Sequence, residues 1–192
     1  SEGGGNGRLG TLEGGRNLSK LEAGQMEVDG EPVPWIAEGQ RGAEGLQAKA
    51  REKKIDLRLE TESAWAKADD GGVQIIARNL LSNAIKYTEA DGTVWVRSYR
   101  ADGRAVLEVE DTGIGMAPEA VDDLFEPFRQ ASEGFSREYE GTGVGLAVTK
   151  RAAEEMDGSV DVDTEEGEGS RFTVRLPTAG GGEASENGER TP

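Results

Sequence analysis

One segment constrains the fold of this 192-residue chain more than any other, a stretch at 71–87 with strong helical periodicity. Its apolar residues recur at intervals of three and four, which places them on one face of a helix. These residues are Val73, Ile76, Ala77, Leu80, Leu81, Ala84 and Ile85. A helix with one apolar stripe must bury that stripe against another layer of structure.

The same helix carries a polar stripe beside the apolar one. At roughly 100° per residue, Asn79, Asn83 and Lys86 fall within one narrow sector. An amide oxygen is a suitable ligand for Mg²⁺ alongside phosphate oxygens, and a lysine adds positive charge where phosphates would lie. A solvent-exposed polar edge is the alternative that this helix alone leaves open.

The rest of the chain alternates between helix and strand patterns. Further helices are predicted at 17–28, at 35–54, in a short segment after Pro118, and at 144–156, while strands are predicted at 55–60, 64–69, 93–99, 105–111, 159–164 and 170–176. Asp102-Gly103 is a hairpin signal between two of these strands. Helices interleaved among hairpins predict an α/β (α+β) fold, a two-layer α/β sandwich with a mixed, mostly antiparallel sheet.

Composition excludes several classes of function. A formal net charge of −16 argues against a nucleic-acid surface, because phosphates would be repelled over most of the molecule. The absence of cysteine excludes disulfide and thiolate chemistry. No apolar run reaches the length of a membrane helix and no signal-peptide pattern is present, so we expect a cytoplasmic chain without membrane contact of its own.

Three glycine-rich motifs follow the periodic helix. In "EDTGIGM" (110–116), Asp111 ends a core-facing strand and can accept from an exocyclic amine such as that of adenine, and the glycines would let a flat ring approach the backbone. "EGTGVGLAVTK" (140–150) precedes a predicted helix, whose exposed N–H groups can cradle an anion. "GEGSRF" (167–172) enters the last strand. Each motif has a plainer alternative: a glycine turn, a flexible hinge and a hairpin turn, respectively.

Two familiar phosphate motifs are absent. The dinucleotide-binding fingerprint needs a strand directly before it and a glycine where Leu146 stands. The pattern G-x-x-x-x-G-K-[ST] does not occur, so the chain is not a P-loop protein.

The order of the motifs is more specific than any one of them. Over about residues 50–177 the sequence resembles the ATP-binding domain of sensor histidine kinases, in the Bergerat-fold superfamily that also holds DNA gyrase and the Hsp90 chaperones. The matches are Asn79, Asn83, Lys86 and Tyr87 to the N box, Asp111, Gly113 and Gly115 to the first glycine box, "LFEPFRQ" (124–130) to the F box, Gly141, Gly143 and Gly145 to the second glycine box, and Gly167 and Gly169 to the third.

The resemblance implies roles for these positions. Asn83 would bind Mg²⁺, Asp111 would read adenine, Tyr87 would lie against the nucleotide, and the loop at 126–143 would be the ATP lid. The full set implied to bind ATP is Asn79, Asn83, Lys86, Tyr87, Asp111, Gly113, Gly115, Phe125, Phe128, Arg137, Gly141, Thr142, Gly143, Val144, Gly145 and Leu146, with Arg129 as a further phosphate-contact candidate in the lid.

The resemblance also implies a phosphoryl-transfer enzyme and its partners. The ATPases of the superfamily carry a glutamate four residues before the metal-binding asparagine, and Asn79 in that place favours transfer over hydrolysis. The chain contains no histidine, so no acceptor and no certain catalytic residue is present. We expect the acceptor histidine on a dimerisation hairpin of a parent kinase. This parent would be a homodimer, either free in the cytoplasm or anchored to a membrane, and it would act on a response regulator. The alternatives are an inert nucleotide-responsive signalling module and a serine kinase of the anti-sigma-factor type.

The expected domain organisation follows. Residues 1–15 form a flexible glycine-rich lead-in, 16–33 the end of a dimerisation helix and a linker, 34–177 the ATP-binding catalytic domain, and 178–192 a disordered tail or linker.

Overall fold

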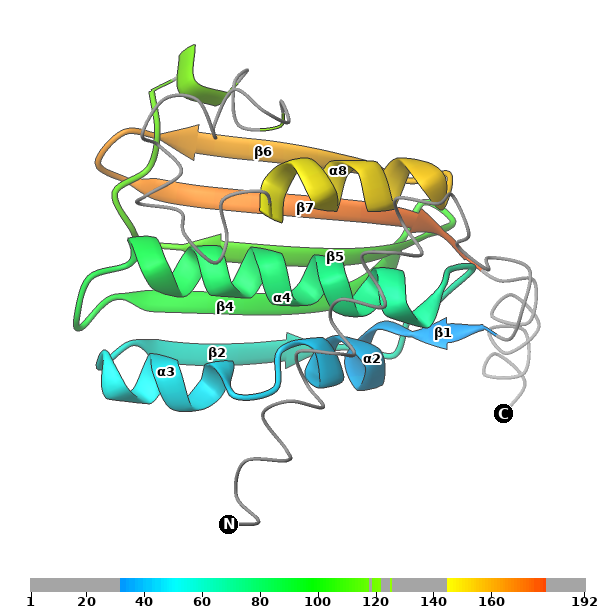
Figure 1. The fold of residues 1–192 in the computed structure, drawn as a ribbon, viewed down its shortest axis with the longest axis horizontal. Helices are drawn as coiled ribbons and strands as arrows, with labels where there is room; N and C mark the ends of the chain where they lie inside the picture. Colours follow the sequence, from blue (N-terminus) through cyan, green and yellow to red (C-terminus); the bar gives the residue numbers. More distant parts are fainter. Residues whose placement is uncertain (1–31, 118, 122–124, 126–144, 179–192) are drawn as a thin grey trace, which may run out of the picture.

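A five-stranded sheet forms one layer of the molecule and helices cover one of its faces (Figure 1). The computed structural model describes residues 32–117, 119–121, 125 and 145–178. The sheet has the order β2 (Asp56–Thr61), β4 (Thr93–Ala101), β5 (Arg104–Asp111), β7 (Gly169–Pro177) and β6 (Ser159–Glu165). Only β2 and β4 pair in parallel, so the predicted mixed, mostly antiparallel sheet is confirmed.

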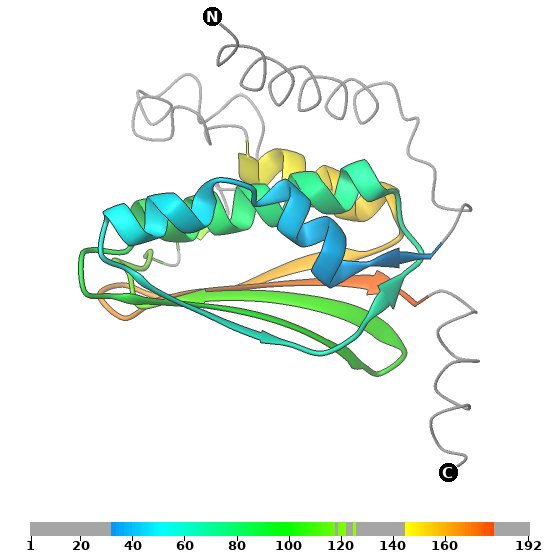
Figure 2. The same cartoon turned by 90° about the horizontal axis from the view of Figure 1, so that it is seen from below.

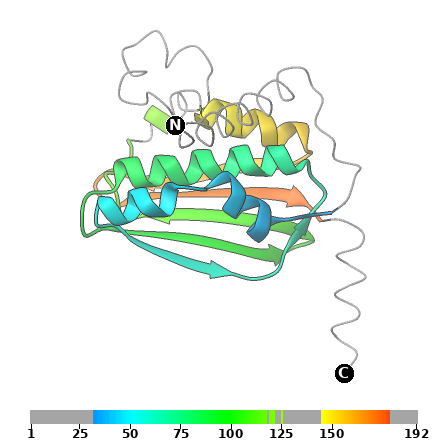
Figure 3. The ribbon, with the colours of Figure 1, turned by 60° about the horizontal axis from the view of Figure 1, so that its bottom comes forward.

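The helical layer is centred on α4 (Asp70–Tyr87), the helix that the sequence predicts most strongly. Figures 2 and 3 show the helices on one side of the sheet only, with α8 (Gly145–Glu155) on one flank of α4 and α2 (Trp35–Gly42) and α3 (Leu46–Glu52) on the other. The apolar stripe of α4 is buried as predicted, with Val73, Ile76 and Leu80 almost fully inaccessible. Within the described ranges, no helix combines the length and apolar composition needed to cross a membrane.

The prediction of a single helix at 35–54 is wrong, because this segment forms two separate helices, α2 and α3. Gly42 closes α2 against α4, where a Cβ would lie 2.2 Å from the backbone oxygen of Gln74. Gly45 then adopts a left-handed conformation, with φ of +87°, and α3 starts after it. The Arg78 side chain donates to the carbonyl oxygens of Gly42 at 3.1 Å and Glu44 at 3.3 Å, which satisfies backbone groups exposed by the break.

The strand predicted at 64–69 is shorter than expected and belongs to another sheet. Only β3 (Trp65–Ala66) is extended, and it pairs with β1 (Val33–Pro34). On its other side, Ala66 bridges to Thr178, and Lys67 N donates to Pro177 O at 2.7 Å. The strand ends early because Asp69 is the N-cap of α4, where its side chain accepts from Gly72 N at 3.1 Å.

The hairpin predicted between β4 and β5 is confirmed. Asp102 and Gly103 have φ of 53° and 73°, the left-handed pair that a two-residue hairpin turn needs. The β6–β7 hairpin is also present. Of the helix expected after Pro118, the structure describes residues 119–121, which are helical. The predictions for 1–15, 16–31 and 179–192 lie outside the described residues.

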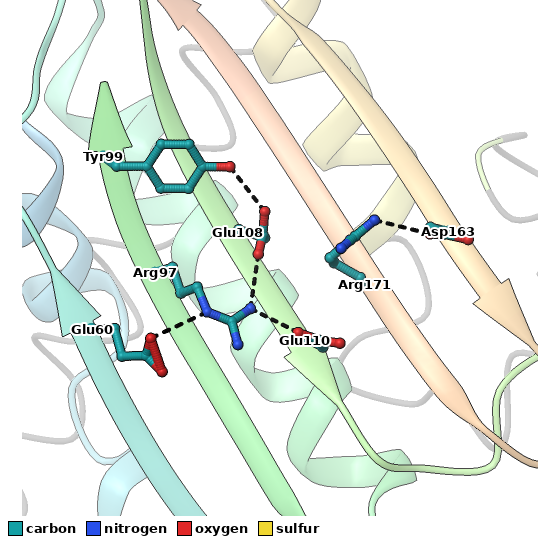
Figure 4. Close-up of polar contacts among 7 residues, drawn as sticks. All are labelled: Glu60, Arg97, Tyr99, Glu108, Glu110, Asp163 and Arg171. Atoms are coloured by element: carbon teal, nitrogen blue, oxygen red, sulfur yellow. Dashed lines mark hydrogen bonds and ion pairs between the residues drawn. The ribbon is translucent and has the colours of Figure 1, made fainter. Parts of the chain in front are cut away.

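The face of the sheet opposite the helices carries a network of charges (Figure 4). The Arg97 guanidinium lies 2.8 Å from a Glu108 oxygen, 2.7 Å from a Glu110 oxygen and 3.4 Å from a Glu60 oxygen. The hydrogen bond with Glu110 is the main reason why the pKa of Arg97 is raised. Tyr99 donates to Glu108 at 2.9 Å. The pKa of Tyr99 is raised, mainly by burial and further by this hydrogen bond. This face is therefore polar and ordered by cross-strand pairs.

Candidate functional site

The polar stripe of α4 is not a solvated edge. Asn83 is only 7% exposed, and its Oδ1 atom is buried without a hydrogen-bond partner among the described residues. Asn79 and Lys86 are half-buried. A buried amide oxygen that lacks a partner costs free energy, so such atoms usually have a ligand, an ion or a water to contact.

The C-terminal end of α4 is held in place by three long-range hydrogen bonds. The Lys53 ammonium donates to Ile85 O at 2.9 Å and to Lys86 O at 2.8 Å, where it satisfies two carbonyls of the last helical turn. Tyr87 O accepts from Ile114 N at 3.2 Å, which joins the N box to the first glycine box. The Lys86 ammonium lies 5.7 Å from the centroid of the Tyr87 ring.

Asp111 ends β5 on the helix-facing side of the sheet, the same side as the buried Leu107 and Val109, as expected for the end of a core-facing strand. The residue is 7% exposed, and its Oδ1 accepts from Gly113 N at 2.8 Å. Desolvation raises the pKa of Asp111 to about 6, against hydrogen bonds from the backbone of Gly113 and Ser170 that lower it. A buried carboxylate here is a strong acceptor for a donor on a bound ligand.

The glycines around Asp111 pack backbone against backbone. A Cβ on Gly113 would lie 2.3 Å from Tyr87 O, and one on Gly115, whose φ is +64°, would lie 1.9 Å from Glu165 O. The expectation that these glycines leave room for a flat ring therefore needs correction, since the protein's own backbone takes that space. Gly169, with φ of +118°, approaches Asp111 O in the same way.

A threonine that sequence reasoning missed ties the first and third glycine boxes together. Thr164 Oγ1 accepts from Met116 N at 3.0 Å, donates to Gly169 O at 3.0 Å and lies 2.8 Å from Ser170 Oγ. The only signal for it in the sequence is its helix-facing position in the alternating strand 159–164, which does not identify its partners. The N box and both of these glycine boxes thus form one connected unit.

Some of the remaining residues predicted to bind ATP lie in packed parts of the fold, and the others lie outside the residues that the structure describes. Leu146, at the start of α8, is 3% exposed and belongs to the hydrophobic core. Phe125 is half-buried, with its ring 6.5 Å from that of Phe172 and the Lys150 ammonium 5.9 Å from its centroid. Gly145 begins α8. Phe128, Arg129, Arg137, Gly141, Thr142, Gly143 and Val144 lie outside the described residues.

The single unpartnered oxygen of Asn83 fits a magnesium ion that is bound together with a nucleotide. The buried Asn83 oxygen is a hard neutral ligand, and Mg²⁺ commonly takes few protein ligands together with phosphates and water. Lys86, three residues further along α4, carries the positive charge that phosphates require. The sheet order, the amide-bearing helix and the linked glycine turns are those of a two-layer α/β sandwich, as expected for the ATP-binding domains that the sequence resembles.

Comparison with known proteins identifies the family. Residues 68–180 match the model of the histidine kinase-, DNA gyrase B-, and HSP90-like ATPase family, and the chain belongs to that family. It is 38% identical over 165 residues to the circadian input-output histidine kinase CikA of Synechococcus elongatus, a match that covers 84% of this chain and 22% of that protein. The chain therefore spans about a fifth of the length of this relative.

Solved structures agree with the family assignment. Full-length ShkA in complex with AMPPNP matches with a TM-score of 0.70 and 32% identity, over 92% of this chain and 37% of that one. The Acinetobacter baumannii histidine kinase AdeS matches with a TM-score of 0.67 and 26% identity, over 87% of this chain and 76% of that one. By fold and family, the chain carries the ATP-binding catalytic domain of two-component histidine kinases.

Proposed function

We propose that this chain binds Mg·ATP and serves as the catalytic part of a larger sensor kinase, which transfers the γ-phosphate to a histidine outside this chain. In that protein a dimerisation hairpin would carry the acceptor, the active form would be a cytoplasmic homodimer, and a response regulator would take the phosphate. The sensor histidine kinases among its relatives support this assignment.

The observation that carries the proposal is the buried, unpartnered oxygen of Asn83 on a helix that is joined to the Asp111 turn. Asp111 would accept from the exocyclic amine of adenine, and Lys86 would neutralise phosphate charge. A bound Mg²⁺ would supply charge neutralisation between the phosphates. Asn83 and Asp111 lie at the ends of two elements that the Tyr87–Ile114 hydrogen bond holds together, so the ligand would meet a preorganised frame.

Transfer rather than hydrolysis is favoured by Asn79. A carboxylate at this position could activate water as a base, whereas an amide cannot. The chain has no histidine, so the isolated chain should not become phosphorylated on histidine. Acid-labile phosphate that accumulates on it from labelled ATP would contradict this proposal.

Isothermal titration of ATP with Mg²⁺ and with EDTA tests the metal assignment. The wild-type chain should bind ATP more tightly with Mg²⁺, and Asn83→Ala should lose that difference. Ser82→Ala, one residue away on α4, is the matched control and should keep it. If Asn83→Ala retains the full magnesium dependence, the ligand assignment is wrong.

The transfer step is tested by adding a separately produced acceptor hairpin from a histidine kinase to the chain and labelled ATP. Phosphate should appear on the hairpin with wild-type chain and with Ser82→Ala, and not with Asn83→Ala. If the wild-type chain binds Mg·ATP but releases inorganic phosphate instead, the domain is a hydrolase.

A further inference from the structure

A cavity of about 440 Å³ lies on the other flank of α4 from the candidate nucleotide site. Its lining residues come from α2, α3, α4 and the α2–α3 turn on the helical side and from β2, β4 and β5 on the sheet side. Figure 3 shows these helices lying over these strands. Most of its wall is apolar and comes from Leu57, Leu59, Leu81, Val96, Leu107 and Val109.

The cavity is a consequence of small residues at the helix–sheet contact. Gly39, Ala43 and Gly45 lie above it on and after α2, and Ala77 lies beside it on α4. A Cβ on Gly39 would make ordinary contact with the Ala77 side chain at 3.7 Å, so one more carbon atom fits at this position, and Gly39 itself lines the cavity.

The cavity has a buried inner wall and an edge that is exposed to solvent. Ala77, Leu81, Leu107 and Val109 are buried and form its inner wall, whereas Leu59 at the edge of the sheet is 46% exposed. A pocket of this size that is mostly apolar and open at one end has the properties of a small-molecule site.

The polar groups of the lining define the class of ligand. Ser98 already donates to Glu62 O at 3.1 Å, so the inner part offers few hydrogen bonds to a guest. Gln40, Gln47 and Glu44 lie on α2, on α3 and in the turn between them. A charged molecule would lose its hydration against the apolar wall without a partner there. Anions are further opposed by Glu44 and by the net charge of −16.

Helix geometry separates this cavity from the nucleotide site. At roughly 100° per residue, Ala77 and Leu81 lie about half a turn around α4 from Asn79 and Lys86. Figure 1 shows the same division, with α2 and α3 along one flank of α4 and α8 along the other. A guest in the cavity would therefore contact the helix that carries Asn83 without touching the polar stripe.

We propose that the cavity is a second binding site, which takes a small uncharged apolar molecule with at most one or two hydrogen-bonding groups. The inference is independent of the proposed kinase activity, because it depends only on the packing between α2, α4 and the sheet.

The test uses 1-aminoanthracene, an uncharged aromatic amine whose fluorescence rises in an apolar site. Titrated into the full chain, it should give a saturable rise that saturating Mg·ATP does not abolish. In a methyl-labelled sample it should shift the signals of Leu57, Leu81 and Val96. No saturable binding, displacement by Mg·ATP, or methyl shifts confined to other regions would overturn the proposal.

Variants at Gly39 make the test specific. Gly39→Leu places a side chain into the cavity and should weaken binding of the probe by about tenfold or more. Gly39→Ala, the matched control, adds one methyl group and should leave affinity within about threefold. Circular dichroism tests whether both variants are folded. If Gly39→Leu does not fold, the methyl shifts of the wild-type chain decide whether the probe binds in the cavity. A folded Gly39→Leu that binds the probe like wild type would overturn the assignment.

Discussion

The substitution Asp111→Asn tests both the energetics and the proposed role of the carboxylate at the end of β5. Burial raises the pKa of Asp111 from 3.8 to about 6. A change of about two units corresponds to about 3 kcal/mol of unfavourable free energy for the ionised form in the folded state. Asparagine keeps the shape of the side chain and removes the charge.

The sign of the pH dependence follows from the direction of the shift. Well below pH 4 the carboxyl is protonated in both the folded and the unfolded chain, so the fold does not carry the cost of a buried charge. Between about pH 4 and pH 6 the unfolded chain loses its proton first, so unfolding becomes easier as pH rises. Above about pH 6 the full cost of the buried charge is present.

We therefore expect Asp111→Asn to stabilise the nucleotide-free chain at pH 7.5 by about 1–3 kcal/mol, with a gain of at most about 0.5 kcal/mol near pH 4. The lower bound allows about 1 kcal/mol for weaker hydrogen bonds, because an amide has one acceptor oxygen for the Gly113 and Ser170 backbone donors. The same variant should bind ATP at least about tenfold more weakly, because its amide nitrogen presents a donor where adenine needs an acceptor.

Urea unfolding at pH 7.5 and pH 4 measures the first effect, and isothermal titration of Mg·ATP at pH 7.5 measures the second. Asp163→Asn is the control, because this carboxylate is 76% exposed and pairs with Arg171 at the surface, where ion pairs contribute little. A variant that is less stable at pH 7.5, or equally affected at both pH values, would refute the desolvation argument. Increased stability with unchanged ATP affinity would refute only the adenine role.

Three further outcomes are expected. Gly115→Ala should cost more than about 2 kcal/mol in urea unfolding, because its Cβ would meet Glu165 O, whereas Gly103→Ala, with positive φ but nothing within 4 Å, should cost only about 1 kcal/mol. Lys53→Met should lose about 1–3 kcal/mol in the same assay, because two carbonyls at the end of α4 lose their charged donor. ATP affinity, measured by titration from pH 7.5 to 5, should fall as pH drops below about 6, because protonated Asp111 presents a hydroxyl donor to the adenine amine.

Sequence periodicity was sufficient for the elements that pack in a regular way. The apolar stripe of 71–87 predicted α4 because that helix buries one continuous face, and Asp102-Gly103 predicted its hairpin because the turn type requires left-handed residues. The buried state of Asn83 also agrees with the position of its stripe beside the apolar face.

The features that the sequence did not reveal depend on contacts between distant segments. The break between α2 and α3 is set by the approach of Gly42 to Gln74 O, which no local pattern encodes. Lys53 lies 32 positions from its partner Ile85, and Thr164 lies 48 from Met116. Sequence periodicity predicts on which face of a helix or strand such a residue lies, whereas its hydrogen-bond partners depend on how distant segments pack in the fold.

The short strand β3 has a consequence for how this domain can be connected to others. It pairs with β1, where the described chain enters, and bridges to Thr178, where the described chain leaves. Entry and exit therefore lie close together, one on each side of β3, as in domains that tolerate insertion into a host protein. Polypeptide joined at either end would start from this one corner of the domain, where Ala66 contacts both the entering and the leaving strand.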